Sequence, residues 1–203
     1  MTFVGAVLFA TDAIAQTVMI SGGYYHESKR FSGDPVMNVL DSDVSGLHVG
    51  VGTLVAPRCS VALEIGISGT SNKTTSSSVV FQGQPVSIET EYVNRLSTWS
   101  ALAGLRGPAA GRLQLTYVGG LTFAHFRREI MPASLAPILQ PAPPPTTSVT
   151  IDHVPAATAG LDAAIAAVNH LAIVIFVRAY ALRLSSDLGG FVVRPGVAAL
   201  VTF

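Results

Sequence analysis

The residues of this chain that are best spaced for catalysis are His26, Glu27 and Ser28. In an extended segment the imidazole of His26 and the hydroxyl of Ser28 project from the same side, because side chains alternate between the two faces of a strand. A serine nucleophile also needs a positioned base and a third group that orients this base. The triplet has no third group at a defined spacing. We therefore predict a solvated loop with no catalytic residue, and a protein that is not an enzyme.

The other histidines and the single cysteine indicate neither a metal centre nor a disulfide framework. His48, His125, His153 and His170 fall in different predicted strands or turns, without the short spacings that are typical of zinc ligands. Cys59 has no second cysteine with which to pair. We therefore expect polar or interfacial histidines, no metal and no cofactor.

The composition is that of a membrane protein more than of a soluble domain. Of the 203 residues only 12% are charged, and the formal net charge is zero. The mean hydropathy is +0.50. A nucleic-acid-binding protein would carry a basic excess, and the length suits one domain with a full core.

Apolar side chains alternate with small or polar ones along most of the chain, which is the period of β-strands. A membrane-spanning helix over 156–182 is disfavoured because it would contain Asp162 and Arg178, and a charge at a helix centre costs about 2.5–3.5 kcal/mol. The predicted strands are 17–25, 47–55, 60–70, 95–106, 112–127, 149–166, 171–182 and 191–203. In the four clearest strands, 47–55, 60–70, 112–127 and 171–182, one face is aliphatic and the other is small or polar, as in strands that face lipid on one side and a lumen on the other.

The connections between these strands alternate between short and long. The short links are 56–59, 107–111 and 167–170, and the long links are 26–45, 71–94 and 129–148; the last link, 183–190, is shorter. Outer-membrane barrels combine short periplasmic turns with long external loops in this way. We predict an all-β fold, an eight-stranded antiparallel up-and-down transmembrane barrel. The segment 71–78 is expected to be a flexible Ser/Thr tip, and 132–145 a stiff, proline-rich arch.

The two ends of the chain carry the features of an exported barrel. Residues 1–15 form an apolar run that ends in a small-x-small triplet, which predicts a signal peptide cleaved after Ala15, truncated at its basic start, and a barrel over 16–203. The segment 194–203 resembles the last strand of bacterial outer-membrane barrels of the OmpA-membrane-domain or opacity-protein type. This resemblance implies a Gram-negative outer-membrane location, a monomer, and Phe203 as the signal read by the barrel-assembly machinery.

Strand parity places several charged side chains on the face predicted to line the lumen. They are Glu64, Asp162, Arg178, Arg194 and Arg112. Unpaired charges in a narrow lumen would be costly, so we expect an interior network that plugs the barrel. The alternative is hydration at the rim, for Arg112 above all.

Two further sets of residues are predicted at the external membrane boundary. The expected aromatic girdle is Tyr24, Tyr25, Tyr92, Trp99, Phe123, Phe126 and Phe191. The expected contacts to lipopolysaccharide phosphates are Lys29, Arg30, Arg127 and Arg128. Ordinary hydrated loop charges are the alternative for this second set.

These features predict a non-enzymatic outer-membrane barrel that is structural or binds surface partners through its external loops. Its partners would be outer-membrane lipid, lipopolysaccharide and the barrel-assembly machinery, and no nucleic acid. One alternative is a small lipid-modifying enzyme, since the His26–Ser28 triplet is similar to that of outer-membrane lipid A deacylases, whose wider motif is missing here. The other alternative is a soluble lipocalin-like carrier, with its aliphatic side chains facing inward.

Overall fold

The computed structural model describes residues 17–32, 41–81, 83–132, 146–183 and 189–203 as one all-β domain. The predicted signal peptide and most of the proline-rich segment 132–145 lie outside the described residues. The strands are β1 (Val18–Ser32), β2 (Ser42–Ala56), β3 (Cys59–Ser68), β4 (Ser71–Phe81), β5 (Gln84–Arg106), β6 (Leu113–Pro132), β7 (Ser148–Val168), β8 (Leu171–Arg183) and β9 (Gly189–Thr202). The described part of the chain contains no helix long and apolar enough to cross a membrane.

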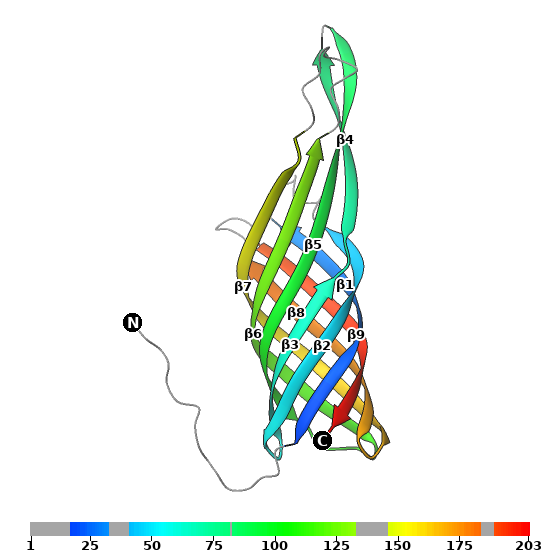
Figure 1. Ribbon diagram of the computed structural model, residues 1–203, viewed down its shortest axis with the longest axis vertical. Coiled ribbons are helices and arrows are strands. Elements are labelled where there is room, and N and C mark those ends of the chain that lie inside the picture. The colour runs from blue at the N-terminus through cyan, green and yellow to red at the C-terminus, as the bar shows by residue number, and fades with distance from the viewer. Residues whose placement is uncertain (1–16, 33–40, 82, 133–145, 184–188) are drawn as a thin grey trace, which may run out of the picture.

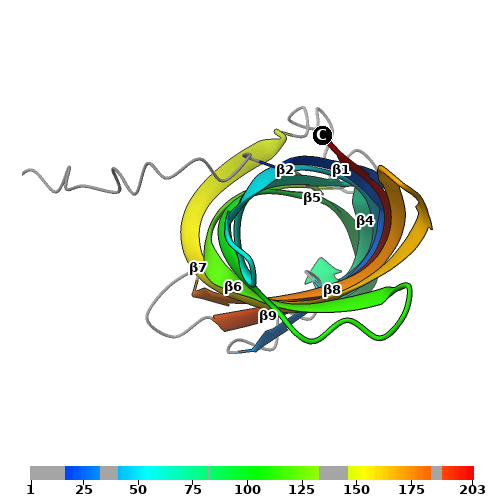
Figure 2. The same cartoon turned by 90° about the horizontal axis from the view of Figure 1, so that it is seen from below.

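Eight of these strands close into a barrel. Strand β1 pairs antiparallel with both β2 and β9, and β3 pairs with β5, so that the ring runs β1-β2-β3-β5-β6-β7-β8-β9 and back to β1. Figure 2 shows the ring from the end where the C-terminus lies. The prediction of an eight-stranded antiparallel up-and-down barrel is confirmed by this topology.

Strand β4 lies outside the ring and continues the line of β3 along β5. Ile67 is opposite Ser97 and Ser71 is opposite Asn94, so that three residues (68–70) face two (95–96). One extra residue on one strand of a pair is a β-bulge, which bends and twists the strand in which it occurs. The Ser68 hydroxyl bridges the interrupted ladder, since it donates to the Leu96 carbonyl at 2.6 Å and accepts from the Leu96 amide at 3.0 Å.

The segment 71–94, predicted as a link with a flexible tip at 71–78, is instead a regular β-hairpin. Its register runs from Ser71 opposite Asn94 to Phe81 opposite Gln84, and Gly83 at the turn has φ +80°. Threonine and valine favour strands, and every residue of β4 gains a ladder partner on β5. The hairpin projects beyond the barrel, away from the C-terminus (Figure 1).

The other long links also begin and end as strand. Strand β1 continues through Ser32, seven residues past the predicted boundary at Tyr25, and β6 continues to Pro132. The short links are tight turns at the opposite end, which we call the short-turn end; the end with the projecting hairpin is the hairpin end. The alternation of short and long connections is thus real, but the long ones contain more strand than expected.

The barrel wall is apolar on its outside. Leu121, Leu47 and Leu63 are 74%, 64% and 61% exposed, although each lies in the middle of a strand. Among the described residues, the outward-facing positions of β1 from Val18 to Tyr24 hold no Asp, Glu, Lys or Arg. The outward-facing positions at the same height on the other seven strands of the barrel hold none either. A soluble barrel would hide such a surface, so this band is built to contact lipid.

Candidate functional site

The lumen holds two ionic centres, each built around one arginine. Arg178 on β8 lies between Glu64 of β3 and Asp162 of β7. Its Nε and Nη2 donate to the Glu64 carboxylate at 3.1 and 2.6 Å. Its Nη2 also donates to Asp162 Oδ2 at 3.2 Å, and its Nη1 to the other oxygen of that carboxylate. The planar guanidinium is suited to such paired contacts with carboxylates.

The second centre is built around Arg194 of β9, which is the cross-strand neighbour of Arg178. The Arg194 side chain extends toward the hairpin end, and its Nε donates to Glu27 Oε2 at 2.7 Å. Its Nη1 donates to the Thr98 hydroxyl. Lys29 completes the centre with its ammonium 3.1 Å from Glu27 Oε1, and both of these side chains are 0% exposed.

Aromatic rings cover the guanidinium of Arg194 on two sides. Its Cζ lies 4.6 Å from the ring centroid of Tyr25 and 4.9 Å from that of Tyr180. An arginine over an aromatic face gains a cation–π attraction, which is larger when water is excluded. The space left between the two centres is a cavity of only about 10 Å³, which is at the limit of what one water molecule requires.

Two glycines make room for the arginines. A Cβ on Gly66 would lie 2.6 Å from Nη1 of Arg194, and a Cβ on Gly160 would lie 2.9 Å from Cδ of Arg178. Side chains at these two positions would displace the guanidiniums from their carboxylates. Small inward residues are therefore part of how the sequence fits long charged side chains into a narrow barrel.

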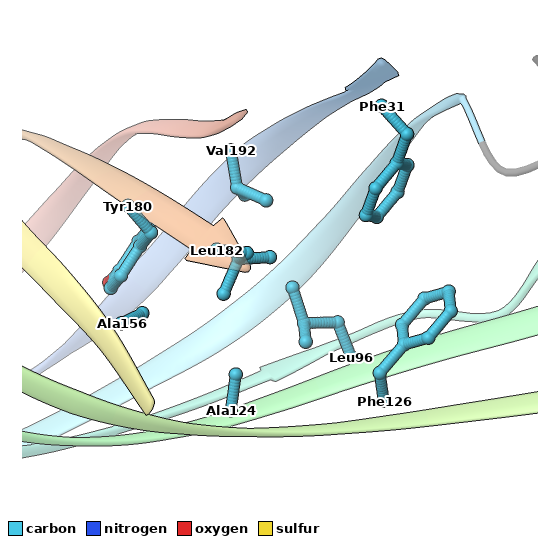
Figure 3. Close-up of a cluster of buried hydrophobic side chains, with 8 residues drawn as sticks. All are labelled: Phe31, Leu96, Ala124, Phe126, Ala156, Tyr180, Leu182 and Val192. Carbon is cyan, nitrogen blue, oxygen red and sulfur yellow. The ribbon is translucent and has the colours of Figure 1, made fainter. Parts of the chain in front are cut away.

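An apolar layer fills the lumen above the Arg194 centre, toward the hairpin end. Figure 3 shows its side chains converging from β1, β5, β6, β7, β8 and β9; they are Phe31, Leu96, Ala124, Phe126, Ala156, Tyr180, Leu182 and Val192. The rings of Phe31 and Phe126 lie 5.7 Å apart across the barrel. We call this set the apolar layer.

Below the Arg178 centre, the short-turn end of the lumen contains a cavity of about 110 Å³ lined by both polar and apolar residues. Ser21 and His48 line it, with the serine Oγ 3.2 Å from the imidazole Nε2. His48 also packs on Phe176, with ring centroids 4.9 Å apart. The cavity ends at Arg178, so the lumen changes along its axis from this cavity to ion pairs and then to apolar packing.

The structure brings together three of the five predicted lumen charges, namely Glu64, Asp162 and Arg178. Arg194 is also inside but pairs with Glu27 instead. Arg112 is not in the lumen network, because it lies exposed in the turn before β6, as the alternative of hydration at the rim expects. Glu27 and Lys29 were missed as lumen residues because the first strand was predicted to end at Tyr25; continued alternation past that residue was the available signal.

Of the predicted aromatic girdle, four residues face outward and two face the lumen. Tyr24, Trp99, Phe123 and Phe191 are 53%, 60%, 49% and 51% exposed on the outer wall. Tyr25 and Phe126 are 1% and 2% exposed inside the lumen. Adjacent residues of a strand point to opposite faces, so Tyr24 and Tyr25 could not both contact lipid.

Tyr92 is the remaining predicted girdle residue. It has the same parity along β5 as the inward-facing Asn94 and Leu96, and it is only partly exposed. It is paired opposite Lys73 of β4, above the bulge. Tyr92 therefore belongs to the hairpin end of the sheet and not to the outer belt.

Of the four predicted lipopolysaccharide contacts, Lys29 and Arg128 are placed on the inward face, which contradicts the prediction for them. Arg30 and Arg127 do lie on the outside. Arg30 Nη2 lies 3.2 Å from Asp43 Oδ2, and Arg127 Nη2 lies 2.5 Å from Glu129 Oε1.

The segment with the His-x-Ser spacing is strand and not loop, with His26 and Ser28 on the outward face of β1. The Ser28 hydroxyl donates to Asp43, beyond the apolar band. Together with Arg30, this hydrogen bond holds the pKa of the Asp43 carboxyl below its usual range. A carboxylate so stabilised is a weak base toward a serine hydroxyl. This contact therefore does not activate a nucleophile.

Two histidines that are far apart in the sequence are neighbours on the outer wall. His125 and His153 are opposite each other on β6 and β7, with their Nδ1 atoms 3.3 Å apart. Phe123 stacks on the His153 ring at 5.6 Å. Among the described residues, no group of three or more His, Cys, Asp or Glu side chains could hold a metal ion.

Comparison with known proteins shows similarity in fold. No family model and no curated protein matches the sequence. The chain is similar in structure to Neisserial surface protein A, with a TM-score of 0.58 and 8% identity over 92% of this chain and 97% of that one. It is also similar to a major outer membrane protein from Thermus thermophilus, with a TM-score of 0.59 and 12% identity over 93% and 100% of the two chains.

A third similar structure is Ail, the attachment invasion locus protein of Yersinia pestis, crystallised with the heparin analogue sucrose octasulfate. Its TM-score is 0.50, with 13% identity over 91% of this chain and 98% of that chain. At these identities the likeness concerns the fold. The resemblance to small outer-membrane barrels, predicted from the C-terminal strand, is confirmed.

Proposed function

We propose that this protein is a non-enzymatic barrel of the bacterial outer membrane, closed to solutes, which presents its strand extensions at the cell surface. The exposed apolar band supports the membrane location, because only lipid or a very large partner would cover it. The similar solved barrels come from bacterial outer membranes, which agrees with this location.

The proposal depends above all on the order of the layers along the lumen. Eight strands leave an interior just wide enough for side chains. Here that interior contains two ion-paired arginines and, above them, the apolar layer. The remaining cavity of about 110 Å³ stops at the Arg178 centre. A hydrated ion would have to displace both layers to pass.

Features of the hairpin end support the proposed role at the cell surface. Strands β4 and β5 form a ribbon that projects beyond the barrel, and β4 has a free outer edge among the described strands. Its residues are mostly serine and threonine, which expose hydroxyls to solvent. Ail, of similar fold, is an attachment protein; by analogy, we propose that this ribbon contacts partners outside the cell.

The remaining partners are also proposals. Outer-membrane lipid would surround the apolar band. Phe203, the proposed assembly signal, is 71% exposed, and its amide donates to the Val18 carbonyl at 2.9 Å. The last residue is thus held beside the start of β1, where the barrel closes.

Planar-bilayer recording tests the closed lumen. The purified full chain should insert without a steady conductance of porin size. A double variant that removes the two large rings of the apolar layer, Phe31→Gly with Phe126→Gly, should stay closed or show only brief small openings, because the ionic centres remain. A stable porin-sized conductance of the wild-type protein would overturn the proposal.

A further inference from the structure

Two arginines stand side by side on the outer wall near the hairpin end. Arg95 of β5 and Arg127 of β6 are direct cross-strand partners, and both are exposed. Like charges in this arrangement destabilise a sheet. Glu129 pairs with Arg127 at 2.5 Å, whereas no described residue forms an ion pair with Arg95.

A hollow lies between these arginines, where the bulge interrupts the wall. It has a volume of about 110 Å³ and is lined by Thr70, Val93, Asn94, Arg95, Arg127 and Glu129. One water molecule needs only about 10–15 Å³ of such space, so a group the size of a phosphate fits. The bulge creates the hollow because residues 68–70 and 95–96 do not pair one to one.

Asn94 lines the hollow, but its side chain has the inward parity of Leu96 and is 0% exposed. Its amide is therefore not accessible from the hollow. The charged side chains of the lining decide which ligand the hollow can take. The charged residues of the lining, two arginines and one glutamate, sum to +1. The net positive lining and the arginine without an ion-pair partner favour an anion.

The position of the hollow along the barrel axis, relative to the membrane boundary, indicates which kind of anion it binds. Trp99 and Phe123 are opposite each other on the same outward faces, four residues closer to the short-turn end than Arg95 and Arg127. Four residues of a tilted strand rise roughly 10 Å. Tryptophan is enriched at the boundary of the hydrocarbon region, where aromatic girdles flank the apolar band of a barrel, so the hollow lies at the level of lipid headgroups.

We propose that this hollow binds the phosphate group of an outer-leaflet lipid, with Arg95 and Arg127 as its charged donors. The membrane source of this phosphate rests on the proposed function. Arg127 was among the residues expected from the sequence to contact lipopolysaccharide, whereas its cross-strand partner Arg95 was not. Lys29 and Arg128, which were also expected there, face inward.

The proposal is tested with the full chain in detergent micelles and two probes, bisphosphorylated lipid A and the same lipid after removal of both phosphates. Arg95→Gln should weaken binding of the phosphorylated probe about tenfold or more, the loss expected for a charge-assisted hydrogen bond. It should leave binding of the dephosphorylated probe unchanged. Glu129→Gln should strengthen binding of the phosphorylated probe, because it removes the negative charge from the hollow.

Arg30→Gln is the matched control, since Arg30 is an exposed outward arginine that is paired with Asp43 on the opposite part of the wall. It should change affinity less than about twofold. Equal losses for Arg95→Gln and Arg30→Gln would overturn the proposal, as would equal binding of the two probes by the wild-type chain. Inorganic phosphate that binds as tightly as the lipid would show a soluble ligand and also overturn it. A variant that still shows heat-modifiable migration has a folded barrel, so each of these failures is distinct from failure of the proposed membrane function.

Discussion

In the lumen, one arginine neutralises two carboxylates, while the other shares a single carboxylate with a lysine. Arg178 is the cation bound by both Glu64 and Asp162, whose side chains are 10% and 22% exposed. Glu27 would keep Lys29 if Arg194 were removed. The two arginines therefore differ in what their loss leaves behind, although they are cross-strand neighbours.

This difference predicts unequal stability losses. Arg178→Met should lower the free energy of unfolding by about 3–5 kcal/mol, because a buried charge left without its partner is destabilising; water reaching Asp162 would reduce the figure. Arg194→Met should cost less. Equilibrium unfolding by urea in lipid vesicles measures both. A larger loss for Arg194→Met would contradict the assigned pairing.

Sequence alone could predict the residues of the Arg178 centre, because alternation fixes which face of a strand each side chain occupies. The same rule excludes Tyr25 and Phe126 from the lipid face, and applying it strictly would have corrected the girdle. The pairing of Arg194 with Glu27 depends instead on strand register, which alternation does not define. The register of β6 and β7 likewise brings His125 and His153 together.

At the scale of elements, the strands of the barrel wall were predictable and their extensions were not. The wall strands are marked by an aliphatic face, whereas β4 is rich in serine and threonine, a composition that also suits loops. Pairing with β5 makes it a strand. The bulge at 68–70 leaves no sequence mark beyond Gly69, so the hollow beside Arg95 was not predictable.

The hairpin can be removed if it is an extension and not part of the wall. Replacing 72–93 with Asn-Gly, which favours a two-residue turn, joins Ser71 to its ladder partner Asn94. The shortened chain should refold and keep heat-modifiable migration in electrophoresis. Loss of folding would show that β4 is needed to close the barrel.

The orientation of the barrel is tested by thiol labelling of intact cells. Cys59, at the short-turn end, should react with an impermeant maleimide only after the outer membrane is permeabilised. In a Cys59→Ser background, Ser76→Cys in the exposed part of β4 should react without permeabilisation. The reverse pattern would place the hairpin in the periplasm.

At the scale of the whole molecule, polar and apolar side chains are placed in the reverse of the arrangement found in a soluble barrel. Its charges and hydrogen-bonding groups are inside, and its aliphatic side chains are outside. An apolar layer within the lumen departs from this inversion at the hairpin end. Both features follow from the alternation of side chains along long strands. Each strand continues the same alternation of inward-facing and outward-facing residues through the membrane and beyond it.

The outward apolar face is the central claim, and the single tryptophan reports on it directly. Trp99 is 60% exposed on the outer wall. With the protein refolded into vesicles, lipids brominated on their acyl chains near the headgroup should strongly quench its fluorescence, and aqueous iodide should quench it weakly. Strong quenching by iodide with none by brominated lipid would mean that this face meets water, and the membrane barrel would be excluded.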